Sequence, residues 1–125
     1  MHTDKLPRQH GVKHILAAFG YSMCGLRTAL SETAIRHELA IGVIHFILLA
    51  VLHLPLSSKL VLTCLLGGVL IVELLNTAIE AVVDIASPSK NALAKKAKDL
   101  GSAAVFCSLL LFLASWAFAI MEAAR

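Results

Sequence analysis

Charged residues are scarce in this chain of 125 residues: Asp, Glu, Lys and Arg make up 15%, against 58% hydrophobic residues. A soluble domain of this size needs more polar surface, and the mean hydropathy of +0.83 favours an integral membrane protein. Aromatic residues are few, and the basic residues flank apolar runs instead of alternating with aromatics, which argues against nucleic-acid binding. The length allows one domain, residues 1–125.

Cysteine is also rare, and familiar nucleotide-binding motifs are missing. Cys24, Cys64 and Cys107 are far apart without CxxC spacing, so we interpret them as small packing residues. The chain contains no GxxxxGK[ST], GxGxxG, HRD or DFG motif. These absences exclude the P-loop and protein-kinase architectures.

Four segments predict an all-α membrane protein. Apolar residues recur every three or four positions from Val12 to Leu30, which predicts an amphipathic helix over about 11–31 that lies in the membrane interface. Apolar runs predict transmembrane helices over about 39–56, 60–86 and 100–121. Polar residues 31–38 and a basic connection over 89–99 separate them. Trp116 and Phe118 near the end of the last run resemble interfacial aromatics.

The basic residues predict the topology. The segment before the first apolar run and the 87–99 connection together hold nine of the eleven Lys and Arg residues. By the positive-inside rule both are cytoplasmic and the C-terminus lies outside, in a multi-pass membrane protein.

A polar stripe runs along the second apolar run. Glu73, Asn76, Glu80 and Asp84 are spaced i, i+3, i+7 and i+11, so they share one helix face. An acid at the centre of a membrane helix costs about 2.5–3.5 kcal/mol on insertion scales. A helix of this length is roughly 39 Å long against a hydrocarbon core of about 30 Å, so Glu73 lies within the hydrocarbon and Asp84 reaches the headgroups. Such a site suits chemistry between a lipid and a soluble ligand.

The residue types indicate what that chemistry needs. Glu32, Glu80 and Asp84, near the cytoplasmic surface, are oxygen ligands suited to Mg²⁺, and Lys98 suits a transferring phosphoryl group. Burial of Glu73 disfavours its charged form, which suits a general base for a lipid hydroxyl.

Two other interpretations stay open. The acids can pair with Arg27, Arg36 or Lys98 and only stabilise the bundle, although no basic residue lies inside a predicted span near Glu73. Intramembrane acids also mark ion or proton translocation. His45, on the same face as Glu38, is interpreted as a core histidine that a neighbouring helix satisfies, with no site role.

The stretch Glu-x-Leu-Asn-Thr-Ala-Ile-Glu-x-x-Val-Asp, from Glu73 to Asp84, resembles the signature of the prokaryotic diacylglycerol kinase family. Similar segments follow the family's order along nearly the whole chain, including Gly20-Tyr21-Ser22, Arg36-x-Glu38 and the run from Lys98 to Ala104. The resemblance implies a homotrimeric enzyme of the cell inner membrane with three spans. It transfers the γ-phosphate of ATP, with Mg²⁺, to diacylglycerol and gives phosphatidic acid.

The resemblance also implies roles for individual residues. Glu73 is the catalytic base, and it contacts the lipid substrate together with Ser102. Glu32 and Glu80 hold the metal. The expected nucleotide contacts are His14, Tyr21, Glu32, Asn76, Glu80, Asn91, Lys98 and Asp99.

The chain departs from the family pattern at two places: Arg27 and Glu32 are one residue closer together, and Met23 replaces a tryptophan. A related branch phosphorylates undecaprenol, although Arg36-x-Glu38 is more similar to the diacylglycerol branch. Because three spans enclose little space, we expect neighbouring subunits of the trimer to shield Glu73 from lipid.

Overall fold

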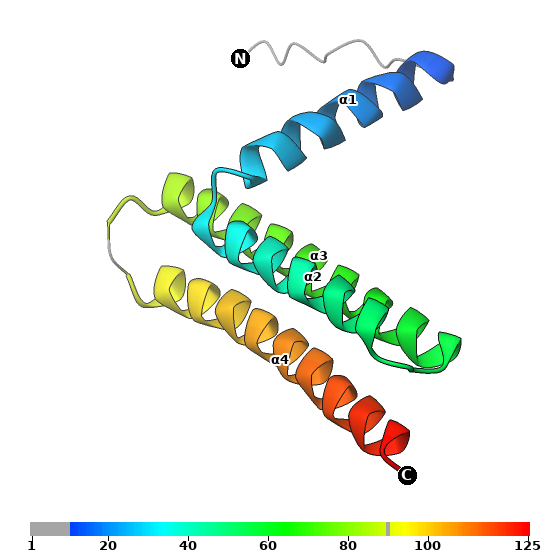
Figure 1. Ribbon diagram of the computed structural model, residues 1–125. Helices are drawn as coiled ribbons and strands as arrows, with labels where there is room; N and C mark the ends of the chain where they lie inside the picture. Colours follow the sequence, from blue (N-terminus) through cyan, green and yellow to red (C-terminus); the bar gives the residue numbers. More distant parts are fainter. Residues whose placement is uncertain (1–10, 90) are drawn as a thin grey trace, which may run out of the picture.

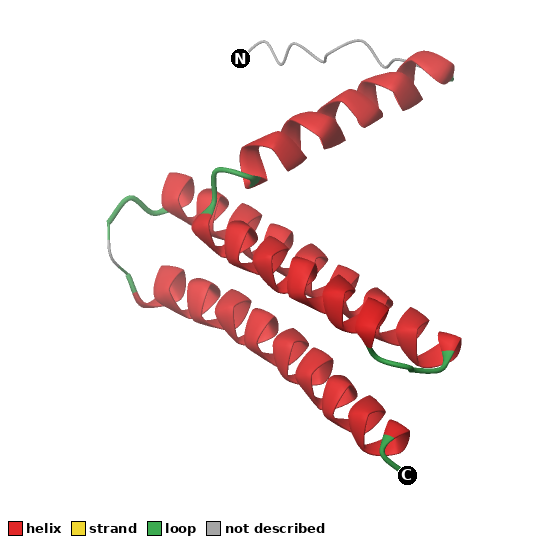
Figure 2. Cartoon of the chain, in the orientation of Figure 1, coloured by secondary structure: helices red, strands yellow, loops and turns green. Residues whose placement is uncertain are grey.

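The computed structural model describes residues 11–89 and 91–125, and within these ranges every regular element is an α-helix (Figures 1 and 2). The helices are α1 (Val12–Ala29), α2 (Thr33–Val51), α3 (Leu56–Ala86) and α4 (Ala92–Ala123). The predicted all-α fold class is therefore confirmed.

Helices α2, α3 and α4 lie side by side and alternate in direction, while α1 leads away from them at an angle (Figure 1). Helix α3 packs most extensively against α4 and less against α2. All three are long and apolar enough to cross a membrane. Their arrangement brings the start of α2, the end of α3 and the start of α4 to one end of the bundle.

The helices extend beyond the apolar runs. Helix α2 begins at Thr33, so the segment interpreted as a polar break is mostly helical, with Ile35 and Glu38 buried and Arg36 and His37 exposed. Helix α4 likewise begins at Ala92, inside the expected basic connection. Hydropathy indicates only the part of a helix that is apolar on all sides. A helix can extend beyond that part when one face is buried against its neighbours and the other face is polar.

Proline and a lysine shape the turn between α2 and α3. The residue before a proline avoids the helical region, and Pro55 is the N-cap of α3. The Lys59 side chain then donates a hydrogen bond of 2.7 Å to the carbonyl oxygen of Leu49, in the last turn of α2. A cation there satisfies a carbonyl that the helix leaves free.

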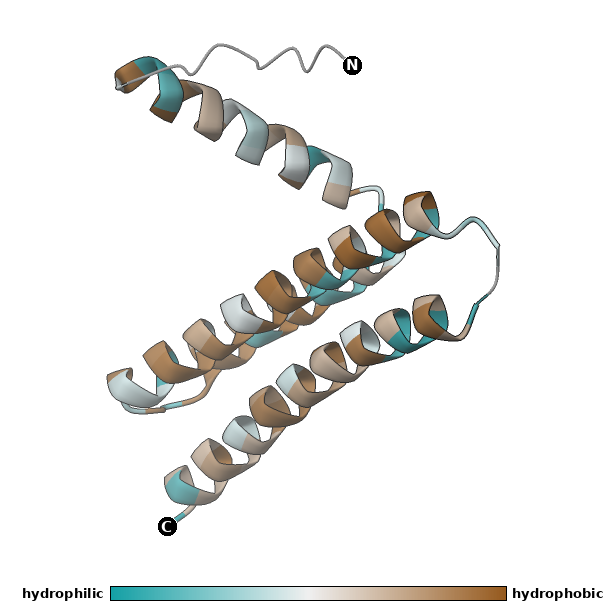
Figure 3. Cartoon of the chain, turned by 180° about the vertical axis from the view of Figure 1, so that it is seen from behind, coloured by the Kyte–Doolittle hydropathy of each residue, from teal (hydrophilic) through white to brown (hydrophobic). Residues whose placement is uncertain are grey.

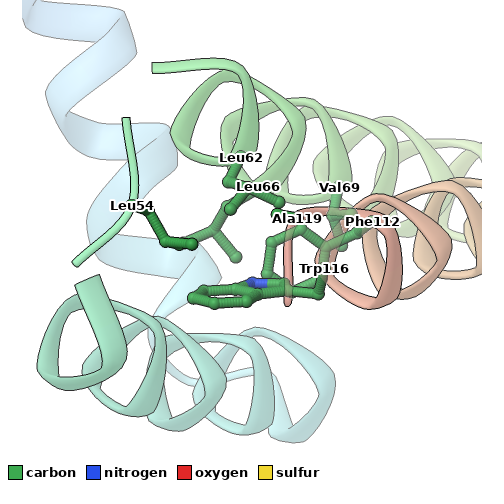
Figure 4. Close-up of a cluster of buried hydrophobic side chains, with 7 residues drawn as sticks. All are labelled: Leu54, Leu62, Leu66, Val69, Phe112, Trp116 and Ala119. Atoms are coloured by element: carbon green, nitrogen blue, oxygen red, sulfur yellow. The ribbon is translucent and has the colours of Figure 1, made fainter. Parts of the chain in front are cut away.

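The buried apolar core lies in the half of the bundle next to that turn. It consists of seven residues from the turn, α3 and α4 (Figure 4): Leu54, Leu62, Leu66, Val69, Phe112, Trp116 and Ala119. Trp116 is only 8% exposed, so the expectation that it is an interfacial aromatic is wrong. Phe118, two residues later on the helix, is exposed at 67%.

His45 explains why Trp116 turns inward. The Trp116 Nε1–H donates to Nδ1 of His45 at 3.3 Å, and the other ring nitrogen of His45 lies 3.3 Å from Oγ1 of Thr63. Thr63 in turn donates to the carbonyl oxygen of Lys59 at 2.8 Å. His45 is 1% exposed and links α2, α3 and α4, which confirms the interpretation of a satisfied core histidine.

Most large apolar side chains remain exposed. Ile71 on α3 and Leu111 on α4, for example, are 60% and 62% exposed. Figure 3 shows brown, hydrophobic residues along most of α3 and α4, with teal residues where α4 begins. An outward apolar surface with polar ends is what a lipid environment requires, because lipid solvates the apolar side chains that water would not.

Candidate functional site

The predicted stripe on α3 is buried at its Glu73 end. Glu73 is 6% exposed and Asn76 is 8% exposed, whereas Glu80 is half-buried and Asp84 is exposed. The stripe thus runs from the interior of the bundle toward the open end next to the α3–α4 connection. One chain already buries Glu73, so the burial of this residue does not require the neighbouring subunits that we expected to shield it.

A glycine on α4 makes room for Asn76. A Cβ atom placed on Gly101 would overlap Oδ1 of Asn76, and Gly101 itself is buried. The run of small residues at the start of the last span therefore does allow close helix packing, as small residues do in membrane proteins. Its specific effect is to let the Asn76 amide lie between α3 and α4.

Asn76 connects this close contact to Glu80. Its Nδ2 donates to Oε1 of Glu80 at 3.4 Å, while its buried Oδ1 has no hydrogen-bond partner within the described chain. A buried carbonyl oxygen without a partner is costly, and here that cost is borne where α4 covers the stripe. Over the residues that the structure describes, no three His, Cys, Asp or Glu side chains gather as a complete metal site. Two carboxylates with substrate phosphates still suffice for Mg²⁺.

Glu38 is a second buried acid, which the sequence pattern left without a role. It lies on α2, is 5% exposed, and its Oε2 atom is buried without a hydrogen-bond partner. Glu38 precedes His45 by seven residues, which places both on the inward face of α2. That spacing was the sequence signal that could have indicated the burial of Glu38. It was not used because residues 31–38 were interpreted as a polar break between helices.

Two residues expected to contact the nucleotide form ion pairs. Nζ of Lys98 donates to Oδ1 of Asp84 at 2.6 Å, joining the start of α4 to the end of α3. Asp99 accepts from Lys95 at 2.5 Å within α4. For Asp84 the interpretation as a salt-bridge partner is thus confirmed. Exposed pairs of this kind contribute about 0–1 kcal/mol, so a bound polyphosphate can replace them.

Asn91 caps helix α4. Its Oδ1 accepts from the backbone N–H of Ala94 at 2.8 Å, and its Nδ2 donates to Oγ of Ser87 at 2.5 Å. A side-chain cap of this kind satisfies one of the free N–H groups at a helix start. The cap fixes where α4 begins and therefore where Lys98 and Asp99 lie.

The remaining predicted site residues are more dispersed. His14 and Tyr21 are exposed on α1, which makes only sparse contacts with the other helices. Glu32 is exposed at the N-cap of α2, and Ser102 is exposed on α4. The structure therefore brings Glu73, Asn76 and Glu80 together, and leaves the residues of α1 apart from them.

Fold and site together define a small helical membrane protein. An acid and an amide are buried between its spans, and the polar stripe to which they belong reaches the surface at one end of the bundle. A family model, described as prokaryotic diacylglycerol kinase, matches residues 20–120. The chain belongs to this prokaryotic diacylglycerol kinase family.

Relatives over most of the chain agree. The chain is 41% identical to a diacylglycerol kinase of Pseudomonas aeruginosa, over 87% of this chain and 89% of the relative. It is 36% identical to a diacylglycerol kinase of Escherichia coli strain K12, over 85% and 88% of the two chains. It is 34% identical to one of Helicobacter pylori, over 88% and 87%.

Proposed function

We propose that this protein transfers the γ-phosphate of ATP to diacylglycerol and so forms phosphatidic acid and ADP. Family membership supports the reaction type, and the buried Glu73 on an apolar helix is the observation that supports its location. The reaction joins an oily acceptor to a soluble donor. A polar stripe that begins inside the bundle and ends at its surface suits both.

Glu73 is the general base in this proposal. The acceptor hydroxyl oxygen attacks the γ-phosphorus, the bond from that phosphorus to the bridging oxygen breaks, and the hydroxyl proton passes to the Glu73 carboxylate. A positioned base of this kind contributes about 10²–10⁴-fold. Its surroundings exclude water, which otherwise competes with the lipid as acceptor. Ser102, exposed on α4, contacts the lipid substrate.

The ATP phosphates require a cation, and the residues present fit Mg²⁺. The carboxylates of Glu80 and Glu32 are hard oxygen donors, and Mg²⁺ needs only one or two of these beside substrate phosphates. Glu80 and Glu32 hold the metal, and Asn76 orients Glu80 through its hydrogen bond. Bound Mg²⁺ supplies neutralisation of phosphate charge.

The cytoplasmic end of the bundle binds the rest of the nucleotide. Lys98 exchanges Asp84 for a phosphate oxygen, and Asp99 and Asn91 line the same end of α4. His14 and Tyr21 reach the nucleotide from α1, which lies in the membrane interface. The excess of Lys and Arg at this end supports a cytoplasmic orientation, with the C-terminus outside the cell membrane.

The active form is a homotrimer in this proposal. One protomer buries Glu73 but leaves Ser102 and Asp99 exposed. Helix α1 makes few contacts with the other helices, so it lies apart from the polar stripe on α3. Neighbouring subunits enclose these residues, and the exposed apolar faces of α2, α3 and α4 provide surface for their contact.

Phosphate transfer from labelled ATP tests the proposal, in detergent micelles with Mg²⁺ and with diacylglycerol and undecaprenol as parallel acceptors. We expect labelled phosphatidic acid and a much smaller product from undecaprenol. Preference for undecaprenol would assign the related branch. If the folded trimer transfers phosphate to neither lipid, the kinase activity is contradicted. Ion flux without ATP in sealed vesicles would then favour translocation.

A further inference from the structure

The second buried acid, Glu38, has no place in the steps above, yet α2 carries it to the level of Glu73. Two contacts fix the register of the antiparallel helices α2 and α3: His45 meets Thr63, and Gly42 faces the side chain of Leu66. Each residue toward the start of α2 therefore corresponds to one residue further along α3. By this register Glu38 lies opposite Leu70.

Glu73 is one turn beyond Leu70, about 4.5 Å along the helix axis. Helical side chains lean toward the N-terminus of their own helix. In antiparallel helices the two leans converge, so the Glu38 side chain reaches toward Glu73 while the Glu73 side chain reaches back. The register and the two leans together bring the carboxyl groups toward each other.

No cation on the described part of the bundle compensates this pair. On α2 itself, Arg36 and His37 are exposed. On α3, Glu80 is a further acid on the same face, seven residues beyond Glu73. Helix α4 carries no Asp, Glu, Lys, Arg or His between Gly101 and Met121. Two buried carboxylates without a positive partner cannot both be ionised at moderate cost.

We propose that Glu38 is a positioning residue that stays protonated, shares its proton with Glu73 in the resting protein, and donates it as a hydrogen bond to the acceptor hydroxyl during transfer. The inference deepens the proposed function and rests on it. The division of roles follows the general rule that paired acids in different surroundings take opposite protonation states. Here Glu73, nearer the open end and in line with Asn76 and Glu80, is the ionised member that accepts a proton.

The buried Oε2 atom of Glu38 supports this role. It has no hydrogen-bond partner among the residues that the structure describes, although Glu38 is only 5% exposed. A shared proton, or the hydroxyl of a bound lipid, supplies the missing partner. Because an ionised carboxylate only accepts hydrogen bonds, only the neutral acid can donate one to Glu73 or orient the hydroxyl oxygen.

Substitution by glutamine distinguishes the two acids. Glutamine keeps the shape of glutamate and remains a neutral donor, so it imitates a protonated acid but not a base. We expect E38Q to keep kcat within about fivefold of the wild type, whereas E73Q lowers kcat by about 10²-fold or more. E38M, which fills the same space without a donor, lowers kcat by about tenfold or more while trimer and melting temperature are kept.

The pH profile gives a readout that a merely structural role would not move. If Glu38 must stay protonated, its ionisation ends activity on the alkaline side, so E38Q remains active to higher pH than the wild type. Three results would each overturn the proposal. These are identical alkaline limbs of the pH profiles of the wild type and E38Q, a loss of kcat in E38Q as large as that in E73Q, and wild-type kcat in E38M.

Infrared spectroscopy separates failure of this inference from failure of the proposed function, since it needs no turnover. We expect the wild type in detergent at neutral pH to show the C=O stretch of a protonated carboxyl group, shifted in heavy water and lost in E38Q. A wild-type spectrum with carboxylate bands alone would refute proton sharing even if the enzyme is active. A carboxyl band in a protein that transfers no phosphate would leave the shared proton intact and refute the kinase assignment.

Discussion

At the scale of single residues, the site depends on how close α4 approaches Asn76. Alanine at position 101 would place a methyl group where Oδ1 of Asn76 lies. We expect G101A to push the amide aside, break its hydrogen bond to Glu80 and lower kcat by about tenfold, the value of one or two hydrogen bonds. Activity assays of detergent-solubilised protein measure this loss.

The matched control for that variant is G68A. Gly68 is also in a membrane helix, but a Cβ there meets nothing within 4 Å of the same chain. Wild-type activity in G101A, or an equal loss in G68A, would show that the Asn76 contact has no part in positioning Glu80.

A second residue-scale prediction concerns Glu80. E80Q removes one negative charge and leaves the shape and the contact with Asn76 nearly intact. If Glu80 holds the metal, the Mg²⁺ concentration for half-maximal activity rises by about tenfold or more, the cost of one charged ligand. Titration of activity with Mg²⁺ at saturating lipid tests this, and an unchanged half-maximal concentration would remove Glu80 from the metal site.

At the scale of the helices, His45 joins three of them through side-chain hydrogen bonds. H45L keeps an apolar side chain there but leaves the Trp116 Nε1–H and the Thr63 hydroxyl without that partner. An unpaired buried donor costs about 1–3 kcal/mol, so we expect a lower free energy of unfolding and a lower Tm in micelles. H53L makes the same change at an exposed histidine and should leave Tm unaltered.

The double variant H45L/W116F sharpens this test. Phenylalanine removes the orphaned N–H, so part of the lost stability should return relative to H45L alone. Equal Tm values for H45L and the wild type would contradict a stabilising role for the network.

The helices themselves were predictable, and their contacts only in part. Continuous apolar runs indicated three spans, because lipid imposes a minimum length on a membrane helix. The start of α2 was not predictable from hydropathy, since a helix projecting into water needs no apolar run. The inward turn of Trp116 was missed because it depends on His45, which is 71 residues away in the sequence.

The site shows the same division. The i, i+3, i+7 spacing indicated that Glu73, Asn76 and Glu80 share a face, because that relation is local to one helix. The burial of Glu38 and the overlap of Gly101 with Asn76 depend on which helices become neighbours and in what register, and a single-sequence pattern does not contain that information.

At the scale of the whole molecule, the charge distribution predicts one orientation in the membrane. With Cys24, Cys64 and Cys107 replaced by serine, a single new cysteine at Lys96 or Arg125 reports its own side. We expect a membrane-impermeant maleimide to label R125C from outside the inner membrane and K96C only in inverted vesicles. The opposite pattern would place the end that we propose to bind the nucleotide away from cytoplasmic ATP.

The assembly is a further property of the whole molecule. Sedimentation of the detergent-solubilised protein, corrected for bound detergent, should give the mass of three chains. A monomer with full activity would show that the exposed apolar faces meet lipid alone and that one chain completes the site.

The central claim is that Glu73, buried on α3, is the base for phosphate transfer from ATP to a lipid hydroxyl. The most direct test compares kcat of the wild type and E73Q for phosphatidic acid formation, with circular dichroism and trimer mass as controls for folding. We predict rapid transfer by the wild type and a loss of about 10²-fold or more in folded, trimeric E73Q. Substantial wild-type transfer that E73Q retains would contradict the account.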